Sequence, residues 1–149
     1  MEVYLASGAG LLSWCGKWRK IPTPLAHPTL LAACGADVAL ADSVNRLLYR
    51  QGRVSTLPPG VEVLRCWRNQ LLTLSSETNC LTLYDAHDYP LVTSPAGIRP
   101  CDCVVVECQV IVCGCEDGCL HIFSLPDLRE IAAYPVPGCP MRVAADGGV

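Results

Sequence analysis

Short runs of apolar residues, each bounded by turn-forming residues, recur along the chain. Over 70–89 the sequence QLLTLSSETNCLTLYDAHDY has two such runs around a polar centre, and QVIVCGCEDGCLHIFSLPDL over 109–128 has the same layout. Asn79 and Gly118 take the same place in the two segments, and both residue types tolerate the positive φ of a tight turn. Each segment is therefore predicted to form a β-hairpin.

The two hairpins align with a constant shift of 39 residues (109 minus 70). After each hairpin comes a third apolar run, then a Pro/Gly break that contains Pro100 or Pro140, and then a fourth run. Weaker copies of this order precede them, so the predicted units lie near 3–35, 36–69, 70–108 and 109–147, the last running into a further unit. The identities under the shift are Gln70 with Gln109, Glu77 with Glu116, Cys80 with Cys119, Leu81 with Leu120, and Asp88 with Asp127.

The repeat predicts the fold class. Four short strands in each unit, turn residues between them and no helical periodicity indicate an all-β chain built from four-stranded antiparallel units. A repeat of about 40 residues with four strands is typical of a β-propeller blade. The 149 residues form one domain of such blades, with 51% apolar and 17% charged residues to build a core.

The unit resembles the YVTN-type repeat of seven-bladed propellers. The segments LTLYD, LVTSPAGIRP and CDCVVVEC match its second strand, its G-x-x-P break and its innermost strand. WD-repeat propellers are also similar, although Tyr84-Asp85 and Phe123-Ser124 stand where their Trp-Asp pair would lie. The resemblance implies a partial, truncated seven-bladed propeller of about four repeats.

Charge and cysteine content limit the partners and the compartment. A net charge of −3 and a pI near 5.5 disfavour binding to a nucleic-acid backbone. No apolar run reaches the ~18 residues of a membrane span, and the first twenty residues do not have the charge order of a secretory signal. We therefore expect a cytoplasmic protein with no nucleic-acid or membrane partner, in which most of the eleven cysteines are reduced and packed as small apolar residues.

Four of the cysteines allow an alternative. Cys101 and Cys103 alternate along one predicted strand, and Cys113 and Cys115 along the next, so each pair shares a face. If the faces and the register agreed, four thiolates would suit zinc or an iron–sulfur cluster. No C-x-x-C spacing occurs, however, and we expect packing rather than a metal or another cofactor.

The histidines and the acidic residues near them are weaker candidates for a catalytic or metal site. His121 alternates within a predicted strand, which is typical of a structural histidine. Asp85, His87 and Asp88 in YDAHDY would suit a cation, but they fall between two strands, where such residues normally cap backbone groups. We therefore expect a turn there.

One segment near the start of the chain suits a partner surface. WCGKWRK places Trp14 and Trp18 among basic residues that include Arg19. Such residues can stack on bases, yet the acidic chain disfavours this, and a hairpin with packed tryptophans and solvated charges is the plainer interpretation. Trp and Arg are also the residue types that dominate binding energy at protein interfaces.

These patterns favour a non-catalytic propeller scaffold whose blade-end loops bind a protein or peptide. No G-x-S-x-G, H-E-x-x-H or G-x-x-x-x-G-K-[ST] motif occurs, so an enzyme is disfavoured. Two alternatives stay open: an enzyme of the lactonase or quinoprotein type with a site at the channel mouth, and a thiol or metal protein. Because blade faces need neighbours, we also expect either self-association or the remaining blades of a longer chain.

Overall fold

The structure is a computed structural model that describes residues 2–7, 10–35, 37–114, 116–138 and 142–145. All regular structure in these residues is β, as the repeat predicted, and none of it is a helix that could cross a membrane. The fifteen strands are β1 (Val3–Ser7), β2 (Gly10–Trp14), β3 (Trp18–Ile21), β4 (Leu30–Cys34), β5 (Asp37–Asp42), β6 (Leu47–Arg50), β7 (Arg53–Thr56), β8 (Val61–Trp67), β9 (Gln70–Ser75), β10 (Cys80–Tyr84), β11 (Pro90–Pro95), β12 (Pro100–Val106), β13 (Gln109–Gly114), β14 (Cys119–Ser124) and β15 (Glu130–Pro135).

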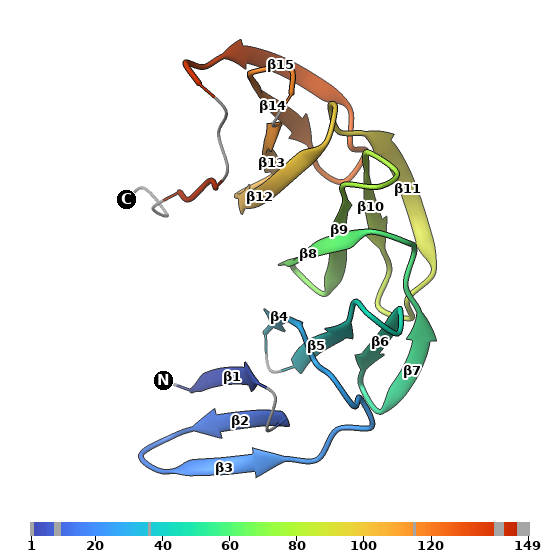
Figure 1. The fold of residues 1–149 in the computed structure, drawn as a ribbon, viewed down its shortest axis with the longest axis vertical. Helices are drawn as coiled ribbons and strands as arrows, with labels where there is room; N and C mark the ends of the chain where they lie inside the picture. The colour runs from blue at the N-terminus through green and yellow to red at the C-terminus, as the bar shows by residue number, and fades with distance from the viewer. Residues whose placement is uncertain (1, 8–9, 36, 115, 139–141, 146–149) are drawn as a thin grey trace.

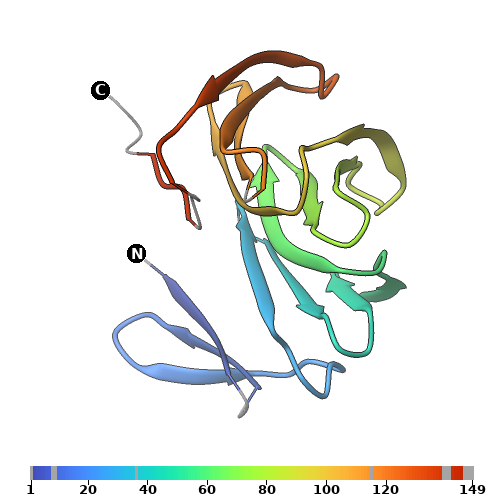
Figure 2. The ribbon, with the colours of Figure 1, turned by 45° about the horizontal axis from the view of Figure 1, so that its top comes forward.

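The strands form four antiparallel sheets in chain order. The first sheet, β1-β2-β3, has three strands among the described residues, and the second (β4–β7), third (β8–β11) and fourth (β12–β15) have four each. The sheets stack side by side along an arc, with β4, β8 and β12 on its concave side and β7, β11 and β15 on its convex side (Figures 1 and 2). Neighbouring first strands contact one another, β4 with β8 and β8 with β12.

The third and fourth sheets begin one strand earlier than the predicted repeat units. The units at 70 and 109 opened on β9 and β13, whereas the third and fourth sheets open on β8 and β12. Hydrogen bonding decides this grouping, because Trp67 pairs with Gln70 and Val106 with Gln109 across tight turns. A repeating sequence fixes the period but not the strand at which a sheet starts.

The hairpin turns follow the turn chemistry of the sequence. Asn79 and Gly118 have φ values of 57° and 66°, the left-handed conformation expected at both positions. Asp85 accepts hydrogen bonds from the backbone N–H groups of His87 (2.8 Å) and Tyr89 (3.0 Å), which confirms the predicted turn in YDAHDY.

The core consists of layers between successive sheets. Leu72, Leu74 and Phe123 belong to the layer between the third and fourth sheets, whereas Leu71 and Ala39 belong to the layer between the second and third. Because successive residues of a strand point to opposite faces, Leu71 and Leu72 bury both faces of the third sheet. The sheets are therefore covered by one another.

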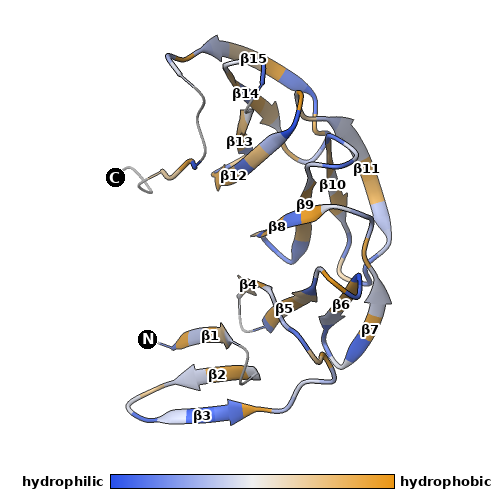
Figure 3. Ribbon diagram, in the orientation of Figure 1, coloured by the Kyte–Doolittle hydropathy of each residue, from blue (hydrophilic) through white to orange (hydrophobic). Residues whose placement is uncertain are grey.

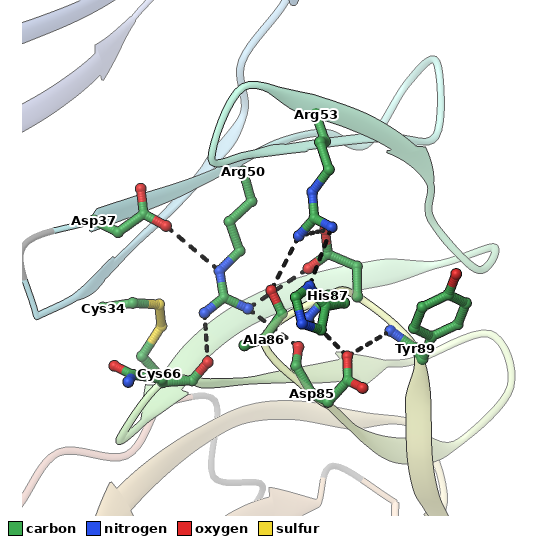
Figure 4. A network of polar contacts seen from close by, with 11 residues as sticks. Cys34, Asp37, Arg50, Arg53, Cys66, Asp85, Ala86, His87 and Tyr89 are labelled. Atoms are coloured by element: carbon green, nitrogen blue, oxygen red, sulfur yellow. Dashed lines mark hydrogen bonds and ion pairs between the residues drawn. A yellow bond between two sulfur atoms is a disulfide. The ribbon is translucent and has the colours of Figure 1, made fainter.

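A buried arginine connects the second and third sheets (Figure 4). The Arg50 side chain, at the end of β6, is 1% exposed and lies 3.6 Å from Asp37 and 3.5 Å from Asp88. It also donates hydrogen bonds to the backbone carbonyls of Asp85 and Asn69 in the third sheet. One guanidinium thus holds acceptors from both sheets at once.

A disulfide also crosses between these sheets. Cys34 in β4 and Cys66 in β8 are bonded, with their Cα atoms 5.4 Å apart. Six of the described cysteines are free, as expected for most of them, but this pair is an exception. The separation of 32 residues in sequence gave no sign that the two strands are neighbours. The stacking of the sheets brings them together.

We expect Arg50→Ala to lower the free energy of unfolding by about 3–5 kcal/mol, because it leaves the buried Asp88 carboxylate with only the 3.8 Å contact to Arg53. Urea denaturation measures this change. The control is Arg53→Ala: its side chain also contacts Asp88 but is 44% exposed, so its loss should cost at most about 1 kcal/mol. Equal effects of the two substitutions would contradict this role for Arg50.

Candidate binding surface

The predicted Trp and Arg residues lie on the β2–β3 hairpin of the first sheet. Trp14 and Trp18 are directly paired across the two strands, and the hairpin turns at Gly16, whose φ is 77°. Trp18 is 56% exposed and Trp14 is half-buried. Directly opposed residues share a face, so the two indoles lie side by side.

The pairing register extends this face across the whole first sheet. Val3 pairs with Trp14 and Leu5 with Leu12, so these side chains share a face with Trp18. Val3 is 40% exposed and Leu5 46% exposed. We call this apolar set the outward face of the first sheet: Val3, Leu5, Leu12, Trp14 and Trp18.

Arg19 does not belong to the outward face. It pairs with Ser13, and strand alternation places it on the opposite side of the sheet from Trp18. The basic residue on the outward face is Lys20, which pairs with Leu12. The structure therefore places the predicted Trp14, Trp18 and Arg19 on one hairpin, but Arg19 lies on the opposite face from the two tryptophans. The alternation of side chains along a strand could have predicted this from WCGKWRK.

The opposite face of the first sheet is packed. Leu11 is 2% exposed and, with Tyr4, Ala6 and Ile21, packs against apolar side chains of the second sheet. Only one side of the first sheet thus has a neighbouring sheet among the described residues.

The same positions in a complete sheet are buried. Counted back from the hairpin turn, Leu5 corresponds to Thr73 and Val3 to Leu71 in the third sheet. Thr73 is 2% exposed and Leu71 is fully buried, because the second sheet covers them. The outward face of the first sheet therefore corresponds to the face of the third sheet that the second sheet covers.

The predicted cysteine set is not gathered into a cluster among the described residues. Cys103 pairs with Val112, while Cys113 pairs with Asp102, so the two thiols point to opposite faces of the fourth sheet. Cys101 is disulfide-bonded, and Cys115 lies outside the described residues. Burial raises the pKa of the Cys103 thiol to about 12, as fits a packed side chain rather than a reactive thiolate.

His121 lies between two carboxylates. Its Nε2 contacts Asp117 and its Nδ1 lies 3.1 Å from Glu130. Burial alone lowers the pKa of His121, but the hydrogen bonds to both carboxylates outweigh burial and raise it above 6.5. The three residues link β14, its preceding turn and β15, which is a structural arrangement like the one expected for this histidine.

The concave side of the arc has an ion pair beside a shallow depression. Arg65 in β8 donates to Asp102 in β12 at 3.0 Å, beside a depression of about 220 Å³ that Leu30, Glu62 and Arg142 also line. A channel-mouth enzyme would place converging acids and histidines here. Among the lining residues, the acids are Glu62 and Asp102, and Asp102 is paired with Arg65.

Solved structures share this arrangement of sheets. A catalytically inactive H270A virginiamycin B lyase from Staphylococcus aureus, solved with quinupristin, has a TM-score of 0.73 at 12% identity over 99% of this chain and 57% of the lyase chain. Apo AztD from Citrobacter koseri gives 0.73 at 12% identity over 95% and 46% of the two chains. The computationally designed Ika8 protein gives 0.71 at 10% identity over 91% and 46%.

The chain has a β-propeller-like fold. It spans about half the length of these three structures, in keeping with a partial propeller. At identities of 10–12% the likeness concerns the fold alone. No family model matches the sequence, and no curated protein matches it either, so the comparisons support neither the YVTN nor the WD type of repeat.

The contacts of His121 predict a pH-dependent contribution to the stability of the fourth blade. Because its folded-state pKa is raised, the stabilisation is fully present below the unfolded value of 6.5 and is lost as the pH rises through the folded-state pKa. His121→Gln should therefore reduce the unfolding free energy more at pH below 6.5 than at higher pH. Urea denaturation across pH measures this, and an equal loss at every pH, or the same profile for the control His27→Gln, would contradict it.

The buried position of Cys103 predicts a packing role. Cys103→Ser should lower the unfolding free energy by about 1–3 kcal/mol, because a hydroxyl group replaces a fully buried thiol among apolar side chains. The exposed Cys15 supplies the control, Cys15→Ser, which should change little. Metal analysis of the reduced wild-type protein and of Cys103→Ser can contradict this role. Stoichiometric zinc or iron that is present in the wild type and lost in Cys103→Ser would favour the thiolate cluster.

Proposed function

We propose that this chain is a non-catalytic β-propeller scaffold that binds a protein or peptide on the outward face of its first sheet. The observation that carries the proposal is the exposure of Val3, Leu5 and Trp18, by 40%, 46% and 56%, at positions of a blade face. A continuous apolar face of this kind on a packed sheet marks an interaction surface.

The residue types on this face suit protein recognition. Trp18 presents a large exposed indole beside Trp14, and aromatic side chains of this kind supply most of the energy at the centre of an interface. Lys20 on the same face, with Lys17 in the turn, gives the hairpin a basic rim. A partner with an apolar centre and acidic residues around it would match both features.

The polar residues support a scaffold rather than a catalyst. Asp42 receives hydrogen bonds from the backbone and side chain of Asn45, and these lower the pKa of its carboxyl group. Asp85 has a lowered pKa for the same kind of reason, since backbone N–H groups of Tyr89 and His87 donate to it. These shifted groups hold turns together, so their chemistry is accounted for by the fold.

Selection from a random peptide library on the immobilised chain tests the proposal. Trp18→Ala should weaken the binding of the selected peptides by about 2 kcal/mol, roughly a thirtyfold increase in Kd, because it removes a central aromatic contact. Val44→Ala is the matched control, since Val44 is 75% exposed in the β5–β6 turn of the second sheet. Peptides that bind both variants as tightly as the wild type would place the binding surface elsewhere and overturn the proposal.

A further inference from the structure

The gap between the first and second sheets contains a pocket of about 200 Å³. Residues of both sheets line it, among them Tyr4, Leu11, Asp37, Leu40, Tyr49 and Gln51. Tyr4 and Leu11 belong to the packed side of the first sheet, so the pocket lies on the opposite side of that sheet from the outward face (Figure 3). It is therefore separate from the surface proposed above for a peptide.

A small side chain stands beside this pocket at a position that an arginine fills in the next gap. β1 contacts β4 as β9 contacts β12, so β1 and β2 correspond to the second and third strands of the other sheets, as β5 and β6 do. Ser13 lies three residues after the start of β2, and Arg50 lies three residues after the start of β6 (13 minus 10 and 50 minus 47). Each side chain faces the following sheet, Ser13 because it shares a face with the packed Leu11. The serine leaves open the space that the arginine occupies one gap further along.

The walls around that space have acceptor groups in the same places. In the next gap, Arg50 donates to the carbonyl of Asn69, directly before β9, and to that of Asp85, directly after β10. The pocket is lined by Asp37, the first residue of β5, and by Gln51, directly after β6. β5 and β6 have the places in the second sheet that β9 and β10 have in the third. One end of the pocket is therefore built like the site that holds the Arg50 guanidinium.

Two carboxylates act on the pocket. Oδ2 of Asp37 is buried without a hydrogen bond, and its ion-pair partner Arg50 lies 3.6 Å away and also contacts Asp88 (Figure 4). A hydrogen bond with Glu2, together with the negative charges of Glu2 and Asp37, raises the pKa of the Tyr4 hydroxyl. The pocket thus lies in a negative environment.

The basic residues nearby do not enter the pocket. No lysine, arginine or histidine is among the described residues that line it. Arg19 pairs with Ser13 and shares its face, but Arg19 is exposed and is not a lining residue. A cation from outside the chain can therefore reach Asp37 there.

We propose that this pocket binds a small organic cation, an ammonium or guanidinium group carried on a short aromatic or apolar body. The cationic group lies beside Asp37, in the place that Arg50 takes in the next gap, and Leu11 and Leu40 contact the apolar body. The rings of Tyr4 and Tyr49 add cation–π attraction. Because about 200 Å³ is below the ~300–1,000 Å³ of usual ligand pockets, the body is no larger than about one ring.

Isothermal titration calorimetry of the 149-residue chain with benzylamine at pH 7 tests this proposal. Benzylamine is protonated at that pH, and benzyl alcohol is the neutral probe of the same shape. Benzylamine should bind one site with a Kd of about 1 mM or lower, and benzyl alcohol at least about tenfold more weakly, because it lacks the charge that Asp37 attracts. Equal binding of the two probes, or no binding of benzylamine, would overturn the proposal.

Substitutions in the pocket locate the site. Asp37→Asn should raise the Kd for benzylamine about tenfold, because the carboxylate is lost. Glu107→Gln removes one negative charge from an exposed turn of the fourth sheet and should leave the Kd unchanged. Tyr49→Phe keeps the ring and should bind like the wild type, whereas Tyr49→Leu should raise the Kd roughly threefold or more.

Ser13→Arg tests the comparison with Arg50 directly. The new guanidinium should fill the pocket, as Arg50 fills the next gap, and should abolish the binding of benzylamine while circular dichroism shows a folded chain. A folded Ser13→Arg chain that binds benzylamine like the wild type would overturn the proposal. The Asp37 and Tyr49 variants decide it if Ser13→Arg does not fold, because unchanged binding in both Asp37→Asn and Tyr49→Leu would also overturn it. None of these results depends on Trp18, so the peptide surface stands or fails separately.

Discussion

The structure depends on one constraint: a sheet that is apolar on both faces must have a neighbour on each side. The third sheet shows how this is met, since Leu71 is buried against the second sheet and Leu72 against the fourth. Burial of apolar surface contributes about 25 cal/mol per Å², so each uncovered face is a substantial loss. The arrangement of sheets along an arc follows from this, as do the two faces at its ends that lack a neighbour among the described residues.

Polar contacts between sheets add alignment to this stacking. Arg50 is almost completely buried and holds Asp37 on its own sheet and Asp88 on the next. Arg65 and Asp102 link the third and fourth sheets on the concave side in a similar way. Breaking a buried ion pair such as Arg50–Asp88 is costly, although the pair contributes little net stability compared with apolar packing. The partly exposed Arg65 makes a weaker link, and the two contacts together favour one relative placement of the sheets.

The same constraint connects the fold to the proposed binding role. A propeller-like fold supports many functions, and the similar structures include a lyase and a designed protein, so function has to be inferred from particular surfaces. Here the surface is the outward face with Trp14 and Trp18, where a position that is buried in other blades is open. A partner that covers that face would give the first sheet a neighbour on its second side.

The sequence by itself determined the local structure. Alternating apolar residues, the turn residues Asn79 and Gly118, and the shift of 39 residues specified the hairpins and their repetition, because strand alternation and turn conformation depend on neighbouring residues alone. They also predicted the hairpin that carries Trp14 and Trp18. The turn role of Asp85 followed from its place between two strands in the same way.

Contacts between distant segments were decided only by the tertiary structure. Cys34 and Cys66 are 32 residues apart, and Arg50 contacts Asp88 on another sheet, so no local sequence pattern predicts either pair. The opposite faces of Cys103 and Cys113 depend on the register between β12 and β13, which a sequence period cannot supply. For the same reason the strand that opens each sheet became known only when hydrogen bonding grouped β8 with β9, and this grouping revealed that β1 presents an edge.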